Sequence, residues 1–478
     1  MGRAGQVRQP IFEKVCLLIR VFRLHLASAT ALIGVLDLGL LLLAGTAGLL
    51  LPGHGADAVA PVTPTHIAAL MLFTTINFLA LVGGGALAPE TLRSGRIAVL
   101  RVLGGLSLGA MALGVLYALA PRVALSSTGS LYAMVFAFLL LICGHWLVTR
   151  WADRDIFCRH VLILGTGPRA LRVAALARDR PGVKLVGHMS LSASDAAMHG
   201  ALHIAPDQSL TLLSRNLHAD ELVLALDERR NALPLSDLVR LRTTGVHILD
   251  ATAFIERETG RIDLRSTNPS ALFFSDGFMS GRRWSARWKR CFDVAAALIL
   301  LILVWPLLLL AGLAIRLDSP GPVLFRQVRV GRYGQSFEVL KLRSMHIDAE
   351  ADGQARWAAA DDPRVTRVGA WIRKVRIDEL PQIWNVLRGE MSFVGPRPER
   401  PAFVRDLEAH IVYYAERHMV KPGITGWAQI NYPYGASRAD ARAKLEYDLY
   451  YAKNYTLFLD ILILLKTIRI IVWPDGAR

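Results

Sequence analysis

Residues 294–315, VAAALILLILVWPLLLLAGLAI, form an uncharged apolar run long enough to cross a bilayer as one helix. Pro306 lies near its middle, where proline removes a backbone donor and disrupts the preceding turn. Basic residues flank both sides of the run: Arg287, Lys289 and Arg290 before it, and Arg316, Arg326, Arg329 and Arg332 after it. A spanning helix would leave one basic flank outside, against the bias of Lys and Arg toward the cytoplasm. We therefore expect a re-entrant hairpin broken at Pro306, with a fifth, kinked span as the alternative.

The composition and four further apolar runs are typical of a membrane protein. Hydrophobic residues make up 53% of the 478 residues, charged residues only 20%, and the mean hydropathy is +0.36. A helix of about 20 apolar residues spans a hydrocarbon core of about 30 Å. Runs near that length occupy residues 29–51, 66–87, 97–120 and 131–148. We expect residues 1–150 to form four transmembrane helices.

The charges around these runs predict their orientation. Basic residues gather before the first run, around Arg96 and after the fourth run, whereas the other two loops hold only Arg122. Since Lys and Arg stay cytoplasmic, both ends of this region and all that follows are expected in the cytoplasm. The net charge of +16 favours an anionic partner. Much of it flanks apolar runs, so membrane lipid is the expected partner and nucleic acid is not.

A second pattern begins at residue 160 with HVLILGTGPRA, a short apolar run followed by a glycine turn. It resembles the opening strand and helix of a Rossmann-like domain. Apolar runs at 221–226 and 245–249 predict a parallel sheet with alternating helices over residues 151–275. Ala170 replaces the third glycine of the nucleotide fingerprint, and Pro168 lies inside the turn. These departures favour a structural or regulatory domain over one that binds a dinucleotide tightly.

Two cations stand close together in the first polar segment after the hairpin. In FEVLKLRSM, residues 337–345, strand alternation puts Lys341 and Arg343 on one face. Such a pair would suit a diphosphate group, and it would equally suit a solvated surface or lipid headgroups. The spacing alone does not choose between these interpretations.

Two adjacent carboxylates, Asp378 and Glu379, follow three basic residues in IRKVRIDELPQIWNVLRGE, residues 372–390. One interpretation is structural: either carboxylate caps a helix that has Pro381 in its first turn and Gly389 just beyond its end. A carboxylate at a helix N-terminus also has a lowered pKa, which suits a nucleophile or a ligand for a hard divalent cation. The two interpretations are compatible.

The C-terminal segment adds one pre-positioned cation. The prolines of GPRP, residues 395–398, stiffen the loop around Arg397, whose guanidinium then suits bidentate phosphate recognition. His418 and the tyrosines within 447–455 have no partner visible in the sequence and are interpreted as packing residues. The last apolar segment, 457–473, is interrupted by charges and predicts an amphipathic helix at the membrane surface.

From about residue 284 to 473 the chain resembles the bacterial sugar transferases, the monotopic polyprenyl-phosphate phosphoglycosyl transferases that begin exopolysaccharide and O-antigen repeats. The resemblance rests on five ordered motifs: KLRSM at 341–345, DELPQ at 378–382, NVL at 385–387, GPRP at 395–398 and KPGITGW at 421–427. The whole chain, including FSDGF at 274–278, is similar to the long exopolysaccharide-biosynthesis polyprenyl glycosylphosphotransferases, and within them to the subgroup found with exosortase systems.

This resemblance implies an α/β catalytic domain over residues 276–478. The domain would face the cytoplasm of the bacterial inner membrane, held there by the re-entrant helix and interfacial helices. Downstream glycosyltransferases and polysaccharide export machinery would be its partners, and a homo-oligomer is compatible with the family.

The resemblance also implies a reaction. Asp378 would attack the sugar-bearing phosphorus of a UDP-hexose, release UMP and pass the sugar phosphate to undecaprenyl phosphate, which initiates an exopolysaccharide repeat. Glu379 would assist and, with Asp378, hold Mg²⁺. Four cations would neutralise the phosphate charge: Lys341, Arg343, Arg373 and Arg397.

Two other functions compete with this one. Membrane-bound nucleotide-sugar dehydratases also join four spans to a Rossmann-like domain, but they need an intact glycine fingerprint and a Tyr-x-x-x-Lys pair, which this sequence lacks. The other alternative is a non-catalytic scaffold of a polysaccharide assembly complex. The intact Asp378–Glu379 pair and GPRP motif weigh against it.

Overall fold

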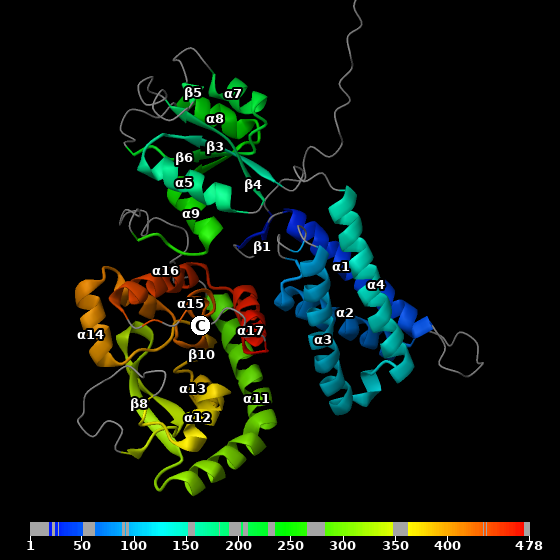
Figure 1. Cartoon of the computed structure of the whole chain (residues 1–478), viewed down its shortest axis with the longest axis vertical. Helices are drawn as coiled ribbons and strands as arrows, with labels where there is room; N and C mark the ends of the chain where they lie inside the picture. The colour runs from blue at the N-terminus through cyan, green and yellow to red at the C-terminus, as the bar shows by residue number, and fades with distance from the viewer. Residues whose placement is uncertain are drawn as a thin grey trace, which may run out of the picture. The chain divides into compact units, whose positions relative to one another are not determined.

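The computed structural model divides into two compact units, Met1–Thr259 and Gly260–Arg478 (Figure 1). The structure describes all residues except 1–18, 22–23, 27, 51–62, 88–90, 92–94, 152–157, 181, 191–201, 204–208, 228–234, 265–282, 348–361, 434, 436 and 473–478. The FSDGF motif at 274–278 lies outside the described residues.

Long apolar helices open the first unit: α1 (Ser28–Leu50), α2 (Pro64–Gly84), α3 (Gly95–Leu119) and α4 (Ser127–Trp151). Each contains a stretch that is apolar and long enough to cross a membrane. Thr63 caps the start of α2 by accepting a hydrogen bond from the backbone of His66, and Gly85 ends it in the left-handed conformation, at φ 77°. Two short strands, β1 (Ile19–Val21) and β2 (Leu24–Leu26), precede these helices, and the turn η1 (Pro121–Val123) joins the last two.

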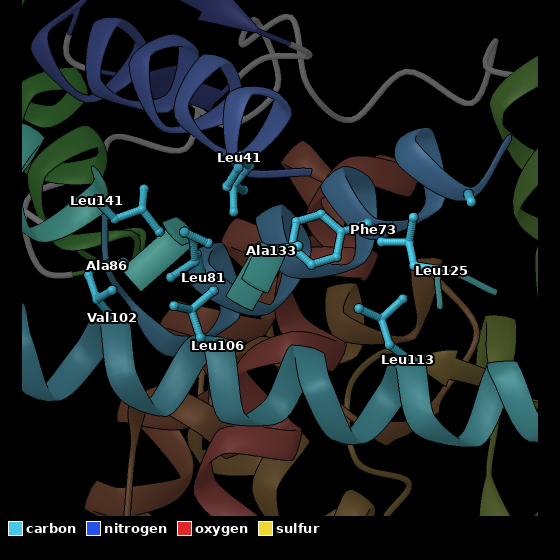
Figure 2. Close-up of a cluster of buried hydrophobic side chains, with 13 residues drawn as sticks. Leu41, Phe73, Leu81, Ala86, Val102, Leu106, Leu113, Leu125, Ala133 and Leu141 are labelled. Carbon is cyan, nitrogen blue, oxygen red and sulfur yellow. The ribbon is translucent and has the colours of Figure 1, made fainter. Parts of the chain in front are cut away.

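The four helices share one apolar core. Figure 2 shows Val102, Leu106 and Leu113 of α3 pointing toward Phe73 and Leu41. Large apolar side chains on the outer faces stay exposed, as they do on helices that contact lipid.

One buried polar pair interrupts the bundle. The side chains of Asp37 on α1 and His145 on α4 are hydrogen-bonded at 2.9 Å, and both are buried. Pairing with each other is the usual solution for ionisable groups among membrane helices.

A five-stranded parallel sheet follows, with strand order β5-β4-β3-β6-β7. Its strands are β3 (Arg159–Leu164), β4 (Val183–Ser190), β5 (Leu202–His203), β6 (Glu221–Leu224) and β7 (His247–Asp250). Helices alternate with them: α5 (Pro168–Asp179), α7 (Leu210–Asn216), α8 (Leu235–Thr243) and α9 (Ala251–Thr259). Buried side chains of α5 and α9 pack on one face of the sheet and those of α7 and α8 on the other. The predicted α/β region with a parallel sheet is confirmed.

The glycine turn of this sheet is filled by a carboxylate. Gly165 has φ 135°, and a side chain at Gly167 would collide with the carboxylate of Asp227, which follows β6. Arg169 Nε lies 3.7 Å from the same group. A carboxylate therefore lies directly against the backbone of the glycine turn.

The long apolar helix of the second unit is α11 (Arg283–Asp318), with Pro306 inside it. The expected break at Pro306 is therefore wrong, because the helix continues through the proline. Loss of one backbone hydrogen bond kinks a helix without ending it, and Figure 1 shows α11 bending between its two ends. By length and composition, residues Ala286–Asp318 are long enough to cross a membrane.

Small helices and two small sheets make up the rest of the second unit. Strands β8 (Leu324–Val330) and β9 (Ser336–Leu342) form an antiparallel hairpin closed by η2 (Arg332–Gly334), and β10 (Ser392–Val394) pairs in parallel with β11 (Gly423–Thr425). The first helical elements are α12 (Arg367–Lys374), η4 (Ile377–Glu379) and α13 (Gln382–Arg388). Those that follow are α14 (Pro401–His410), η5 (Tyr414–Met419), α15 (Trp427–Asn431), α16 (Arg438–Asn454) and α17 (Leu457–Val472).

Both ends of α11 are fixed to this α/β body. Near its start, Arg290 donates to the carbonyls of Val386 and Leu387 at 2.5 and 2.6 Å, where a cation complements the C-terminus of α13. At its end, Asp318 accepts a hydrogen bond from the backbone of Val368 in α12 at 3.1 Å. A straight helix of this length would hold its ends about 54 Å apart. The bend brings both within reach of one small body.

Candidate active site

Glu379 lies at the centre of a group of cations that come from separate segments. Its Oε1 accepts hydrogen bonds from Lys341 Nζ on β9 and from Arg397 Nη2 in the loop after β10, each at 3.1 Å. Arg376 lies 3.9 Å from its Oε2. Burial acts to raise the pKa of Glu379, but Arg397, Lys341 and Arg376 outweigh it and hold the pKa at about 2. Glu379 is therefore ionised, and it binds Lys341 and Arg397, two of the cations that were predicted to bind phosphate.

Asp378 has the opposite environment. Its side chain is buried, and within the described part of the chain its Oδ1 has no hydrogen-bond partner. Burial raises the pKa of this carboxyl, and the neighbouring Glu379 raises it further, against the opposing charges of Lys341 and two arginines. The expected lowering of its pKa is therefore wrong. A carboxylate oxygen that accepts no hydrogen bond and lies next to a cluster of cations keeps its lone pairs available for nucleophilic attack.

The capping interpretation of this pair is also wrong. Asp378 and Glu379 belong to the short turn η4, and the residue that precedes α13 is Pro381, without a side-chain cap. The predicted end of the helix is correct, since Gly389 adopts φ 85° there. Both carboxylates are thus left free for contacts with other segments.

Lys341 and Arg343 do not form the expected pair of neighbouring cations. The strand ends at Leu342, and whereas Lys341 turns to Glu379, the buried Arg343 guanidinium donates to the carbonyls of Pro320 and Ser319 at 2.6 and 2.7 Å. Arg343 therefore holds the turn that follows α11.

Two arginines at the end of α12 complete the positive surroundings. Arg373, which the sequence analysis named, is half-buried, and its charge acts to lower the pKa of Asp378. Arg376, which the sequence analysis missed, adopts the left-handed conformation at φ 59° and faces Glu379. Such a backbone is unfavourable for a non-glycine residue and is found most often at functional sites. In the sequence, the one signal for Arg376 is its position among the basic residues that precede Asp378.

Backbone pairing fixes the loop that carries Arg397. Gly395 donates to the carbonyl of Thr425 at 2.9 Å, and Gly423 donates to the carbonyl of Pro396 at 3.0 Å. A side chain at Gly395 would collide with the backbone carbonyl of Lys421, so only glycine allows this approach. The GPRP and KPGITGW motifs are therefore two halves of one structural element.

Arg417, which the sequence analysis missed, also holds the loop that carries Arg397. This buried side chain pairs with Asp448 at 2.7 Å, donates to the Tyr414 hydroxyl at 2.8 Å and donates to the carbonyl of Arg397 at 3.1 Å. With its backbone held, Arg397 can direct its guanidinium toward Glu379 at little entropic cost.

Asn385 ties α13 to β9. Its side chain is fully buried, accepts a hydrogen bond from the backbone of Leu340 at 3.1 Å, and donates to the carbonyl of Glu338 and the carboxylate of Glu390, both at 2.7 Å. Since Leu340 precedes Lys341, this contact sets the position of the lysine relative to η4.

The residues present are compatible with a magnesium ion that also binds substrate. The described residues contain no group of three or more His, Cys, Asp or Glu that could hold a metal. Mg²⁺ is, however, commonly bound by one or two carboxylates together with phosphate oxygens and water. Among the residues that the structure describes, Asp378 Oδ1 has no hydrogen bond, and the hydrogen bonds that Lys341 and Arg397 donate to Glu379 end on Oε1.

Known proteins are similar to the part of the chain that holds these residues. Residues 284–474, which contain all the residues of the cluster, match the model of a family described as bacterial sugar transferase. A UDP-glucose:undecaprenyl-phosphate glucose-1-phosphate transferase of Caulobacter vibrioides is 46% identical over 191 residues, which are 40% of this chain and 71% of that protein. The chain belongs to the bacterial sugar transferase family.

Longer members of the bacterial sugar transferase family are also similar. A UDP-N-acetylgalactosamine-undecaprenyl-phosphate N-acetylgalactosaminephosphotransferase of Aeromonas hydrophila is 51% identical over 190 residues, which are 40% of this chain and 45% of that protein. An undecaprenyl-phosphate glucose phosphotransferase of Komagataeibacter xylinus is 37% identical over 331 residues, which are 67% of this chain and 60% of that protein. The chain spans about half the length of these two relatives.

Proposed function

We propose that the protein transfers a hexose 1-phosphate from a UDP-sugar to undecaprenyl phosphate, releases UMP and so initiates an exopolysaccharide repeat unit. The observation that carries this proposal is the buried Asp378 carboxylate, whose Oδ1 has no hydrogen bond among the described residues, beside the cation-bound Glu379. The names of the three relatives, all sugar phosphotransferases that act on undecaprenyl phosphate, support it.

The first step forms a covalent sugar phosphate on the enzyme. An oxygen of Asp378 attacks the phosphorus that bears the sugar, the bond from that phosphorus to the bridging oxygen breaks, and UMP leaves with the electron pair. In the second step, a phosphate oxygen of undecaprenyl phosphate attacks the same phosphorus and displaces the carboxylate. Two substitutions at one phosphorus return Asp378 to its original state.

The cations of the site neutralise the phosphates in both steps. Lys341 and Arg397 reach the site from different segments, and Arg373 and Arg376 surround Asp378 with further positive charge. Charge neutralisation by positioned cations is the main contribution of proteins to phosphoryl transfer. Arg343 is excluded from this set by its contacts with the turn after α11.

Asp378 and Glu379 are the proposed Mg²⁺ ligands, together with oxygens of the diphosphate. When bound, the ion would stabilise negative charge on the diphosphate. Glu379 stays ionised at every physiological pH, because its pKa is about 2, and so keeps an anionic oxygen for the ion.

The membrane arrangement proposed for this activity is a re-entrant α11 at the cytoplasmic face of the bacterial inner membrane. The attachment of both helix ends to one body supports it, and so does the exposure of Ile302 and Leu310 in the apolar middle. A site at headgroup depth meets a soluble donor and a lipid acceptor together. In this proposal α1 to α4 span the membrane, the parallel sheet has a structural or regulatory role, and the lipid product passes to downstream glycosyltransferases and export machinery.

UMP release from a panel of UDP-sugars tests the proposal. The full chain is reconstituted in vesicles with undecaprenyl phosphate and assayed with and without Mg²⁺, beside Asp378→Asn and Asp406→Asn. Asp406 is a matched control, since it is an exposed carboxylate on α14 that pairs with Arg438. We expect lipid-dependent UMP from at least one sugar, lost in Asp378→Asn and kept in Asp406→Asn. An active Asp378→Asn enzyme would exclude the covalent step, and a folded wild type that releases no UMP would favour the scaffold alternative.

A further inference from the structure

We propose that Lys289 and Tyr451 are positioning residues that hold the Arg397 loop through the backbone carbonyl of Val394, and that they link this loop to α11 and α17. The inference rests on the proposed function, in which Arg397 neutralises phosphate charge. It concerns residues that do not touch the reacting atoms.

The carbonyl of Val394 is the shared acceptor. It accepts hydrogen bonds from the Tyr451 hydroxyl at 2.9 Å and from Lys289 Nζ at 3.2 Å. Val394 is the last residue of β10, and the loop with Arg397 begins at the next residue. A displacement of this carbonyl would therefore be transmitted directly into the loop.

Asp460 of α17 closes the network. It forms an ion pair with Lys289 and accepts a hydrogen bond from the Tyr451 hydroxyl at 2.7 Å. Only 1% of the Tyr451 and Asp460 side chains is exposed, so these bonds lie away from competing water. The single hydroxyl proton is shared between Asp460 and Val394, whereas the three ammonium protons of Lys289 serve Asp460, Val394 and Tyr451.

A second contact from α11 reaches the same strand. Asp293, one helical turn after Lys289, accepts hydrogen bonds from the Ser392 hydroxyl at 3.1 Å and the backbone of Phe393 at 3.3 Å. Lys289 and Asp293 of α11 therefore form hydrogen bonds with all three residues of β10. Both α11 and α17 are rich in apolar residues, so the network ties the position of the active-site loop to the two helices that the proposed arrangement places at the membrane.

The role differs from simple stabilisation. A buried ion pair adds little net stability compared with a well-packed apolar core, but it specifies one arrangement of the groups that it joins. The arrangement here centres on a backbone carbonyl next to the active-site loop rather than on the core of the domain.

Tyr451→Phe removes only the hydroxyl and is the first test. Tyr447→Phe on the same helix is the matched control, because the Tyr447 hydroxyl makes no hydrogen bond within the described residues. In vesicles, we expect Tyr451→Phe to lower kcat for UMP release about tenfold, with a smaller change in KM, because a small displacement of a positioned group costs up to about 100-fold in rate. Amide hydrogen exchange should rise at Val394, Gly395, Arg397 and Glu399, the residues of segment 394–399 that have an amide hydrogen, and remain unchanged in α12 and α13.

The outcomes separate the inference from the proposed function. If Tyr451→Phe matches Tyr447→Phe in both kcat and exchange, the network does not position the loop. If exchange rises throughout the second unit, the role is general stability and the inference is overturned. Arg397→Lys gives a further check, since Tyr451→Phe should add little loss in that background and a full additional tenfold loss would contradict the inference. Failure of the proposed function is seen separately, as wild-type UMP release that does not depend on Asp378.

Discussion

Asp378 and Glu379 are neighbours in the chain, and their pKa values are shifted in opposite directions. Burial and the adjacent anion raise the pKa of Asp378, whereas three cations hold the pKa of Glu379 at about 2. Within the described part of the chain, Oδ1 of Asp378 has no hydrogen bond, whereas Glu379 binds Lys341 and Arg397. In the proposed mechanism, two consecutive residues thus supply the nucleophile and the anion that holds the surrounding cations.

The pH dependence of the reaction follows from this pair. In the proposed mechanism Asp378 must be ionised to attack, so kcat/KM should fall as the pH drops through its pKa, which burial raises above the ordinary value of 3.8. The Glu379 charge contributes to that rise, so Glu379→Gln should move the acidic limb to lower pH, even though the variant is slower. The measurement is the pH profile of UMP release for both enzymes. A limb that moves to higher pH in the variant would contradict the assignment.

Substitutions of Arg343 and Arg397 should have different effects, the first on stability and the second on activity. Arg397→Ala removes a cation from Glu379, and we expect UMP release to fall about 100-fold or more. Arg343→Ala frees the Ser319–Pro320 turn, so it should lower the unfolding temperature and leave KM for the UDP-sugar nearly unchanged. Thermal unfolding and steady-state kinetics on both variants check this. A large rise in KM with normal stability in Arg343→Ala would restore its phosphate-binding role.

Asn385 should be a stability residue. Asn385→Ala leaves the backbone groups of Leu340 and Glu338 and the Glu390 carboxylate without their partner, which costs about 3 kcal/mol. Glu390→Gln keeps an acceptor for the Asn385 amide and should cost about 1 kcal/mol or less. Denaturation of both variants in the same detergent gives the comparison. Equal losses would mean that the backbone contacts contribute little.

Gly395 should tolerate no side chain. Gly395→Ala places a methyl group against the backbone of Lys421 and Gly423, so the two strands must separate and Arg397 moves with them. We expect a loss of activity of at least about tenfold. Gly187→Ala on β4 is the control, because its methyl group would meet only ordinary contacts at 3.5 and 3.8 Å. Normal activity in Gly395→Ala would show that the loop position is not critical.

Local sequence patterns predicted the members of the site well where a motif carried them. Lys341, Glu379 and Arg397 are in contact, and Asp378 lies beside them. Arg343 was misplaced because strand alternation was extended one residue beyond the true end of β9 at Leu342. The pKa of Asp378 was predicted in the wrong direction because the carboxylate precedes the helix in a separate turn and is buried there.

Long-range partners left no local signal. Tyr451 was interpreted as a packing residue, and its hydroxyl bonds to a backbone carbonyl 57 positions away. Asp460 interrupts an apolar segment, which predicted a charge at the membrane surface, yet its side chain points inward to Lys289. The apolar runs, by contrast, predicted the long helices closely, because helix length and hydropathy are properties of a single segment.

The attachment of α11 at both ends has a consequence for the surrounding bilayer. An unattached helix adapts to a thicker or thinner membrane by changing its tilt. With Arg290 bound near one end and Asp318 at the other, α11 has lost that freedom. In the re-entrant arrangement proposed above, the protein body and not the thickness of the bilayer therefore sets how deep the apolar middle of α11 reaches into the lipid.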